Sequence, residues 1–168
     1  MAKQIGPYHG LKKAWKFFTK DYDSGKFTPF DEADVQCFLY SSLVKAGVEP
    51  RRIHSEWPAK KGGEKRRCDI VLGSRGHERL FIEIKKTSLT KPDVRGSWRK
   101  DLRKLREYHG KVKKLKPAFV LMILRKDKEN KRPIDIDKLE DYQKETLRKI
   151  RKICKHEKIT FLCCPSYK

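Results

Sequence analysis

Two short apolar stretches, residues 68–72 and 80–85, constrain the fold of this chain most. Each has the length of a β-strand and the glycines between them favour a turn, so together they predict a β-hairpin. Because side chains alternate along a strand, one face of the hairpin is purely aliphatic and consists of Ile70, Leu72, Leu80, Ile82 and Ile84. The other face mixes ionisable and apolar side chains, namely Asp69, Val71, Phe81, Glu83 and Lys85.

The second face of this hairpin predicts a small cluster of ionisable groups. Glu83 and Lys85 point the same way, and Asp69 joins them if the turn has an odd number of residues or the strand contains a bulge. A three-residue turn at residues 75–77 would pair Asp69 with Glu83. Burial of such groups costs free energy unless they pair with one another or hold a metal ion.

Two neighbouring carboxylates on a sheet favour a divalent cation between them. At about 4 Å they repel by roughly 4 kcal/mol at an effective dielectric near 20, and a cation relieves that cost. Oxygen ligands suit magnesium, which is usually completed by water and substrate phosphate. A lysine beside the cation can orient or deprotonate a water molecule and stabilise charge on the phosphate. The pattern therefore predicts a site for phosphodiester hydrolysis; the alternative is a solvated hairpin face with a Glu–Lys pair.

Asp69, thirteen intervening residues and then Glu83-Ile84-Lys85 resemble the PD-(D/E)XK nuclease signature, with Cys68 where that signature has a proline. The resemblance extends to small archaeal and phage-type endonucleases and to Holliday-junction resolvases. It implies that Asp69, Glu83 and the backbone carbonyl of Ile84 bind Mg²⁺, with Mn²⁺ as a substitute. It also implies that Lys85 is the catalytic base or the group that orients water.

A helix predicted from about residue 31 to residue 46 carries another acid of interest. Glu32 lies three residues before Val35 and seven before Leu39, so it falls on the stripe that faces the sheet. The resemblance to these nucleases implies that a glutamate here reaches the metal site, with Asp34 as the reserve. The alternative role of Glu32 is to compensate the helix dipole, an effect of about 0.3 to 1 kcal/mol.

The charge of the chain favours a polyanionic partner. Lys and Arg number 43 against 22 Asp and Glu, which gives a net charge of +21. Nucleic acid is the natural candidate, with binding that weakens steeply as salt rises. A structural RNA-binding protein explains the charge equally well, but it does not explain the hairpin carboxylates. The expected nucleic-acid-binding residues are Arg66, Arg67, Lys86, Arg99, Lys100, Arg103 and Lys104.

The remaining stretches predict an α/β domain with a mixed sheet flanked by helices. Before the hairpin we expect a helix over 11–20, which docks through its aromatic residues or stacks them on bases, and a strand over 51–57, closed by Pro58 and a turn at 60–63. A helix over 97–108 follows the hairpin. The apolar run 118–124 predicts a central strand reached by a crossover. A helix starting at Pro133, Asp135 or Asp137 and ending near residue 156, with Leu139, Tyr142, Leu147, Ile150 and Ile153 inward, leads to a strand over 159–163.

This element order resembles the restriction-endonuclease-like αβββαβ core, which would cover residues 31–124 of one domain spanning 1–168. Residues 1–30 would then be an N-terminal helical extension, and residues 125–168 a C-terminal helix and strand. The same resemblance implies that Asp101, Lys104 and Tyr108, on the helix after the hairpin, approach the site.

The cysteines and the N-terminus indicate where the protein works. The five cysteines show no CxxC spacing, and buried free thiols in a reducing compartment explain them better than a zinc site at Cys154, His156, Cys163 and Cys164. Cys163 and Cys164 would face opposite sides of a sheet. No signal peptide or membrane-spanning run is recognisable. We therefore expect an intracellular protein, either cytoplasmic or a viral or phage protein acting inside the host cell.

Together these features predict a magnesium-dependent endonuclease acting on duplex or branched DNA. Junction resolution, restriction, repair and homing all remain open, and one site per chain favours a homodimer for cutting two strands. A non-catalytic DNA- or RNA-binding protein with the same fold is the main alternative. A nuclease acting on RNA is the third.

Overall fold

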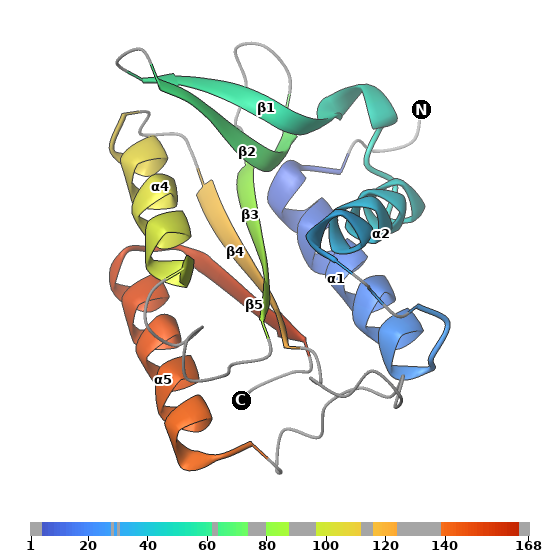
Figure 1. Ribbon diagram of the computed structural model, residues 1–168. Coiled ribbons are helices and arrows are strands. Elements are labelled where there is room, and N and C mark those ends of the chain that lie inside the picture. Colours follow the sequence, from blue (N-terminus) through green and yellow to red (C-terminus); the bar gives the residue numbers. More distant parts are fainter. Residues whose placement is uncertain are drawn as a thin grey trace.

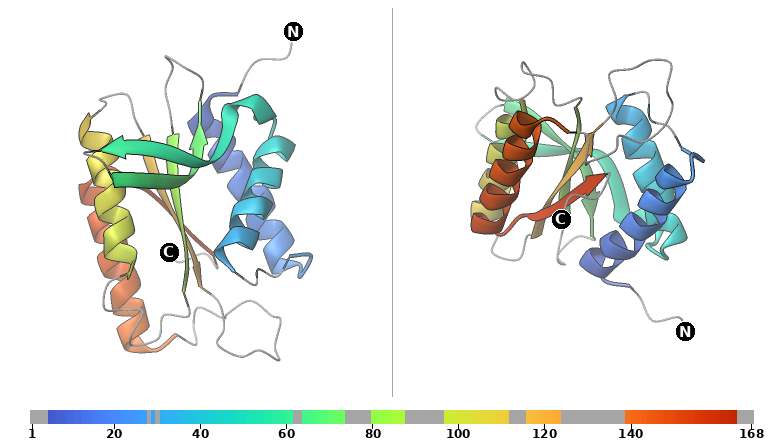
Figure 2. Two further views of the ribbon diagram at one scale, coloured as in Figure 1. Left: turned by 45° about the horizontal axis from the view of Figure 1, so that its top comes forward. Right: turned by 90° about the horizontal axis from the view of Figure 1, so that it is seen from below.

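A five-stranded mixed sheet lies between two pairs of helices (Figure 1). The computed structural model describes residues 5–27, 29, 31–61, 64–73, 80–87, 97–111, 116–123 and 139–164. Helices α1 (Pro7–Asp23) and α2 (Glu32–Lys45) cover one face of the sheet, and α4 (Ser97–Lys111) and α5 (Asp141–His156) cover the other, as both views in Figure 2 show. The predicted α/β class is confirmed.

The strands follow their order in the sequence across the sheet: β1 (Ile53–Lys61), β2 (Glu64–Leu72), β3 (Leu80–Thr87), β4 (Lys116–Ile123) and β5 (Thr160–Cys164). The first three strands are antiparallel neighbours, whereas β3, β4 and β5 run parallel. Helix α4 joins β3 to β4, and α5 leads into β5, because parallel neighbours need a crossover. The predicted sequence of helices and strands is therefore confirmed.

The apolar side chains form two cores, one on each face of the sheet. The aliphatic hairpin face, which consists of Ile70, Leu72, Leu80, Ile82 and Ile84, lies in the core under α1 and α2, together with Phe18, Leu39 and Leu43. Val71 and Phe81 lie in the other core, under α4 and α5, together with Leu105 and Leu147. The alternation predicted for these hairpin residues is confirmed, and it gives β3 two buried faces.

Helix α2 begins and ends where the sequence predicts. The Asp31 side chain accepts a hydrogen bond from the Asp34 backbone at 2.9 Å, and the Asp34 carboxylate accepts one from the Asp31 backbone at 3.2 Å. This capping box satisfies two backbone donors at the helix start. Gly47, with φ of 92°, lies just beyond the last turn and takes the left-handed conformation that glycine tolerates.

Helix α1 extends beyond the predicted range and packs through its aromatic residues. Phe18 is fully buried, and Trp15 and Phe17 pack against the same core. Gly10 lies so close to Val48 that a Cβ atom at position 10 would be 2.5 Å from Cγ2 of Val48. The aromatic residues of this helix therefore dock it onto the sheet, as the first of the two alternatives predicted.

Several predicted boundaries and one predicted core residue are wrong. Strand β1 continues through Pro58, which pairs with Arg67, because β1 is the edge of the sheet and needs no donor on its outer side. Helix α4 runs on to Lys111 instead of ending at residues 109–110. Helix α5 begins only at Asp141, after the capping residue Glu140. Ile153 is 38% exposed, because the buried stripe of α5 continues from Ile150 to Cys154.

The cysteines are free, and most of them are buried. Cys163 lies in one core and Cys164 in the other, as predicted from strand alternation. Cys37 is exposed, so the expectation that all the thiols are buried is wrong for this residue, which lies on the outer side of α2. None of the helices in the described ranges combines the length and hydropathy that crossing a bilayer requires.

Candidate active site

Strand β2 is irregular at Asp69. Cys68 packs in the core under α4 and α5, and Ile70 packs in the opposite core, although regular alternation would put both on one face. The neighbouring strand β1 is irregular at the same place, where Glu56 has φ of 50°. Ser55 pairs with Ile70 and Trp57 pairs with Cys68, but the ladder between β1 and β2 skips Glu56. A local distortion of this kind redirects a side chain out of the alternating pattern.

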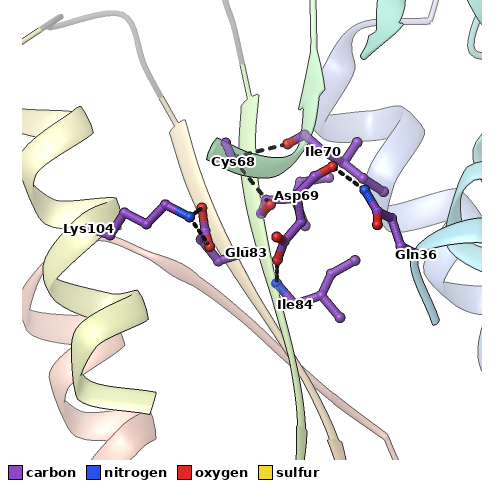
Figure 3. A network of polar contacts seen from close by, with 8 residues as sticks. Gln36, Cys68, Asp69, Ile70, Glu83, Ile84 and Lys104 are labelled. Carbon is purple, nitrogen blue, oxygen red and sulfur yellow. Dashed lines mark hydrogen bonds and ion pairs between the residues drawn. The ribbon is translucent and has the colours of Figure 1, made fainter. Parts of the chain in front are cut away.

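The Asp69 carboxylate lies against the backbone of β3. Its Oδ2 accepts a hydrogen bond of 2.6 Å from the Ile84 backbone, and its carbonyl accepts one of 2.6 Å from Gln36 of α2 (Figure 3). Burial raises the pKa of Asp69, although the hydrogen bond from Ile84 and the charge of Lys104 oppose that rise. The Asp69 carboxylate is therefore partly desolvated, and its hydrogen bond to the Ile84 backbone fixes it between β2 and β3.

The register between β2 and β3 is the one from which pairing of Asp69 with Glu83 was predicted, but the ladder ends at Ile70 and Ile82, one residue before that pair. Ile70 pairs with Ile82 and Leu72 with Leu80, the register that a turn at residues 75–77 gives. The turn itself lies outside the described residues. Although the strands match, Figure 3 shows the two carboxylates turned toward different neighbours, Asp69 toward Ile84 and Glu83 toward α4.

Glu83 is a buried carboxylate with a lysine against it. Only 2% of the residue is exposed, and Nζ of Lys104 lies 2.8 Å from each carboxylate oxygen. Burial and repulsion from Asp69 raise the pKa of Glu83 to about 8, against the opposing effect of Lys104. The chain thus tolerates an acid in its core only by supplying a counter-charge from α4.

The Cys68 thiol lies close to this acid. Its Sγ lies within hydrogen-bonding distance of the carbonyls of Ile70 and Ile82, at 3.5 and 3.4 Å. Burial and the charge of Glu83 raise the pKa of Cys68 well above its usual range. A thiol that resists ionisation is a poor nucleophile, so the raised pKa of Cys68 argues for a packing role beside the site.

Lys85 is joined to the acid predicted on the first helix of the core. Nζ of Lys85 lies 2.9 Å from Oε1 of Glu32, and the same oxygen accepts a hydrogen bond of 3.1 Å from the backbone of Lys86. Burial works against the charge of Lys85, but Glu32, Asp101 and Asp69 together raise its pKa. Lys85 is therefore an ammonium, and Asp34, the reserve acid, is engaged in the cap of α2 instead.

Asp101 completes the charged cluster from α4. Burial and the charges of Asp69 and Glu32 raise its pKa to about 6, although Lys85 and Lys104 act in the opposite direction. Four acids and two lysines thus influence one another: Glu32, Asp69, Glu83 and Asp101 with Lys85 and Lys104. When all of these six groups are ionised, they carry a net charge of −2, which a divalent cation would balance.

The donor chemistry of this cluster fits a hard divalent ion. Its ligands are oxygens only, and Oε1 of Glu83 is buried without a directed hydrogen bond from any described residue. Within the described ranges no three His, Cys, Asp or Glu side chains are already grouped to hold a metal ion. Asp69 and Glu83 would be the protein ligands, and binding would break the contact between Glu83 and Lys104. The predicted ligand role of the Ile84 carbonyl stays a prediction.

The predicted nucleic-acid-binding residues fall into two groups. Arg67, Arg99, Lys100 and Arg103 are exposed, whereas Lys86 is half-buried and Lys104 contacts Glu83. The side chains of Arg66 and Tyr108 lie outside the described ones. An exposed basic surface on α5, next to α4, escaped the sequence analysis and consists of Arg148, Lys149, Arg151, Lys152 and Lys155. The sequence could have revealed this surface, because these basic residues lie on the side of the helix opposite Leu147 and Ile150.

Two contacts in the site were not predicted from the sequence. Gln36 holds the Asp69 backbone, and its spacing of four residues from Glu32 could have placed it on the same side of α2. The ion pair of Lys104 with Glu83 had no signal in the spacing, since it joins residues on a helix and a strand far apart in the chain.

Matches to family models and to curated proteins were sought for this chain, and none was found.

Proposed function

We propose that this chain is a metal-dependent endonuclease that hydrolyses DNA phosphodiester bonds in the manner of the PD-(D/E)XK nucleases. The observation that carries the proposal is the cluster on β2, β3, α2 and α4. Glu83 is buried and Asp69 is partly buried on the neighbouring strand; the charge of Asp69 raises the proton affinity of Glu83, and the ammonium of Lys85 beside them is held by a third acid. A purely structural sheet gains nothing from such a cluster, because each buried charge costs free energy.

Each residue of the cluster has a role in this proposal. Bound magnesium would supply Lewis-acid activation of the phosphate. Asp69 and Glu83 would hold it, and Lys85 would donate to a phosphate oxygen or orient the water that attacks phosphorus as the bond to the leaving oxygen breaks. Because its pKa is raised, Lys85 acts as a fixed positive charge and not as the base. Glu32 positions Lys85 through their 2.9 Å ion pair.

A non-catalytic nucleic-acid-binding protein is the second candidate. The ion pair between Lys104 and Glu83 favours it, because the buried carboxylate is then balanced without a metal ion. Such a protein would bind DNA or RNA with strong salt dependence and leave it intact.

Incubation of a supercoiled plasmid and of a synthetic four-way DNA junction tests the endonuclease proposal. With magnesium we expect cleavage of at least one of them, and none with EDTA. A single-stranded RNA in parallel separates DNA from RNA as substrate. Intact nucleic acid with magnesium and with manganese, at concentrations where binding is saturated, would favour the binding protein.

The exposed residues Arg99, Lys100 and Arg103 of α4 are expected to contact phosphates. Changing all three to Gln should lower the magnitude of the salt slope of DNA binding by about 3, because each phosphate contact contributes about 1. The measurement is fluorescence anisotropy of labelled duplex DNA at several salt concentrations. The matched control changes Lys13, Lys16 and Lys20, exposed on α1 at the opposite face. Equal effects of both triple variants would contradict a specific role for α4.

A further inference from the structure

Lys104 takes the place that a cation bound to Glu83 would need. Its Nζ lies 2.8 Å from both carboxylate oxygens, so the ammonium caps the whole carboxylate (Figure 3). Of the two side chains, that of Glu83 is 3% exposed and that of Lys104 is 19% exposed. The lysine therefore reaches from the edge of the site inward, while the acid is fixed on the central strand.

Two cations cannot share this carboxylate without a large cost. Unit positive charges about 4 Å apart repel strongly even at an effective dielectric near 20, and the double charge of a divalent ion doubles that repulsion. Rotation of the four-carbon stem lets a lysine leave at little cost, whereas Glu83 on β3 has no comparable freedom. Metal binding at Glu83 would therefore drive the ammonium of Lys104 away.

The structure also indicates where the released ammonium goes. Lys104 lies one helical turn after Lys100, which is exposed on α4. Arg103, the neighbour of Lys104, is exposed as well. A side chain that turns away from Glu83 thus joins the basic surface of α4, where a phosphate of bound DNA would lie.

We propose that Lys104 and a divalent cation are alternative partners of Glu83, and that the lysine displaced by the cation binds a phosphate of the DNA. This exchange rests on the proposed endonuclease function. It couples the two ligands, because metal binding makes a phosphate-binding group available and DNA binding draws the competing charge away from the metal ligand. The metal-free protein would thereby hold DNA less tightly than the metal-bound one.

A double-mutant cycle without metal tests the first half of the exchange. In EDTA at about pH 9, where Glu83 is ionised, Lys104→Met should change the dissociation constant of duplex DNA by less than about twofold, because Lys104 is held by the Glu83 carboxylate. On a Glu83→Gln background the lysine is released, and the same change should weaken binding about fivefold, the effect of one phosphate contact. The readout is fluorescence anisotropy of the labelled duplex.

A calcium-containing buffer tests the second half. There Lys104→Met alone should weaken DNA binding about fivefold, because the ion occupies Glu83. The matched control is Lys100→Met, which should weaken binding to the same extent in EDTA, in calcium and on the Glu83→Gln background. Equal effects of Lys104→Met under all of these conditions, including no effect anywhere, would overturn the exchange.

The wild-type protein offers an independent measurement if Lys104→Met fails to fold. The ¹⁵N resonance of the Lys104 side chain should shift when calcium saturates the protein, because its carboxylate partner is lost. An unchanged resonance would overturn the exchange. None of these measurements needs cleavage. A wild-type protein in which calcium and DNA binding are coupled through Lys104, but which cuts no substrate, would therefore contradict the endonuclease proposal and not the exchange. An active protein without the coupling would contradict the exchange alone.

Discussion

Asp69→Asn is expected to lower magnesium-dependent cleavage at least about a thousandfold, which corresponds to roughly 4 kcal/mol of transition-state stabilisation. The change is close to isosteric, and the oxygen of Asn can still accept the hydrogen bond that the Ile84 backbone donates to Asp69 at 2.6 Å. What the variant loses is one negative charge between β2 and β3. A loss of cleavage would therefore report on that charge and not on the packing of the strand.

The measurement is the rate of plasmid nicking or junction cleavage at saturating protein, with DNA affinity determined separately by anisotropy. Affinity in EDTA should stay within about twofold of the wild-type value or increase slightly, because an acid near the phosphates has been removed. Asp141→Asn, an exposed acid in the first turn of α5, is the matched control and should cleave normally. Undiminished cleavage by Asp69→Asn would remove Asp69 from the proposed metal site.

Glu83→Gln is expected to change how the stability of the metal-free protein depends on pH. The pKa of Glu83 is about 8 in the folded chain against 4.5 for an ordinary glutamate. Between these values the folded protein keeps a proton that the unfolded chain has lost, so stability falls as pH rises through this window. Below the window both states are protonated, and above it the penalty is constant. Glu83 should therefore cost roughly 3 kcal/mol of stability between about pH 5.5 and about pH 8.5.

Glutamine cannot ionise, so the variant should lack this part of the decline. The measurement is urea unfolding in EDTA at about pH 5.5 and about pH 8.5, and the relevant quantity is the difference between the two pH values. In Glu83→Gln, Lys104 lacks an anionic partner at both pH values, so this cost to stability is the same at each and cancels in the difference. Glu145→Gln, which removes an exposed acid from α5, is the control and should follow the wild-type profile. Parallel profiles for wild type and Glu83→Gln would contradict the raised pKa.

Most of the fold was predictable because its signals are local. The 2-residue alternation in the hairpin, the start of α2 at Asp31 and the apolar run of β4 each depend on a few consecutive residues. The boundaries that were wrong depend on distant neighbours. Pro58 stays in a strand because none of the described strands pairs with the outer edge of β1. Helix α5 buries Cys154 instead of Ile153 because Cys154 faces the core beneath the helix.

The candidate site divides in the same way. Its acids and Lys85 stand out in the sequence because charge interrupts an apolar hairpin, and the spacing of Glu32 placed it on the inward stripe of α2. The partners of these groups did not stand out. The family resemblance implied that Lys104 approaches the site, but nothing in the sequence paired it with Glu83; the packing of α4 against β3 does that.

By itself, then, the sequence determined which residues carry ionisable groups into the sheet, the order of helices and strands, and the large positive charge. Only the tertiary structure decided which charge neutralises which, that Asp69 binds the β3 backbone, and that Lys85 is held as an ammonium. The physical reason is that alternation and capping act over a few residues, whereas the free energy of a buried charge depends on every group that reaches it through space.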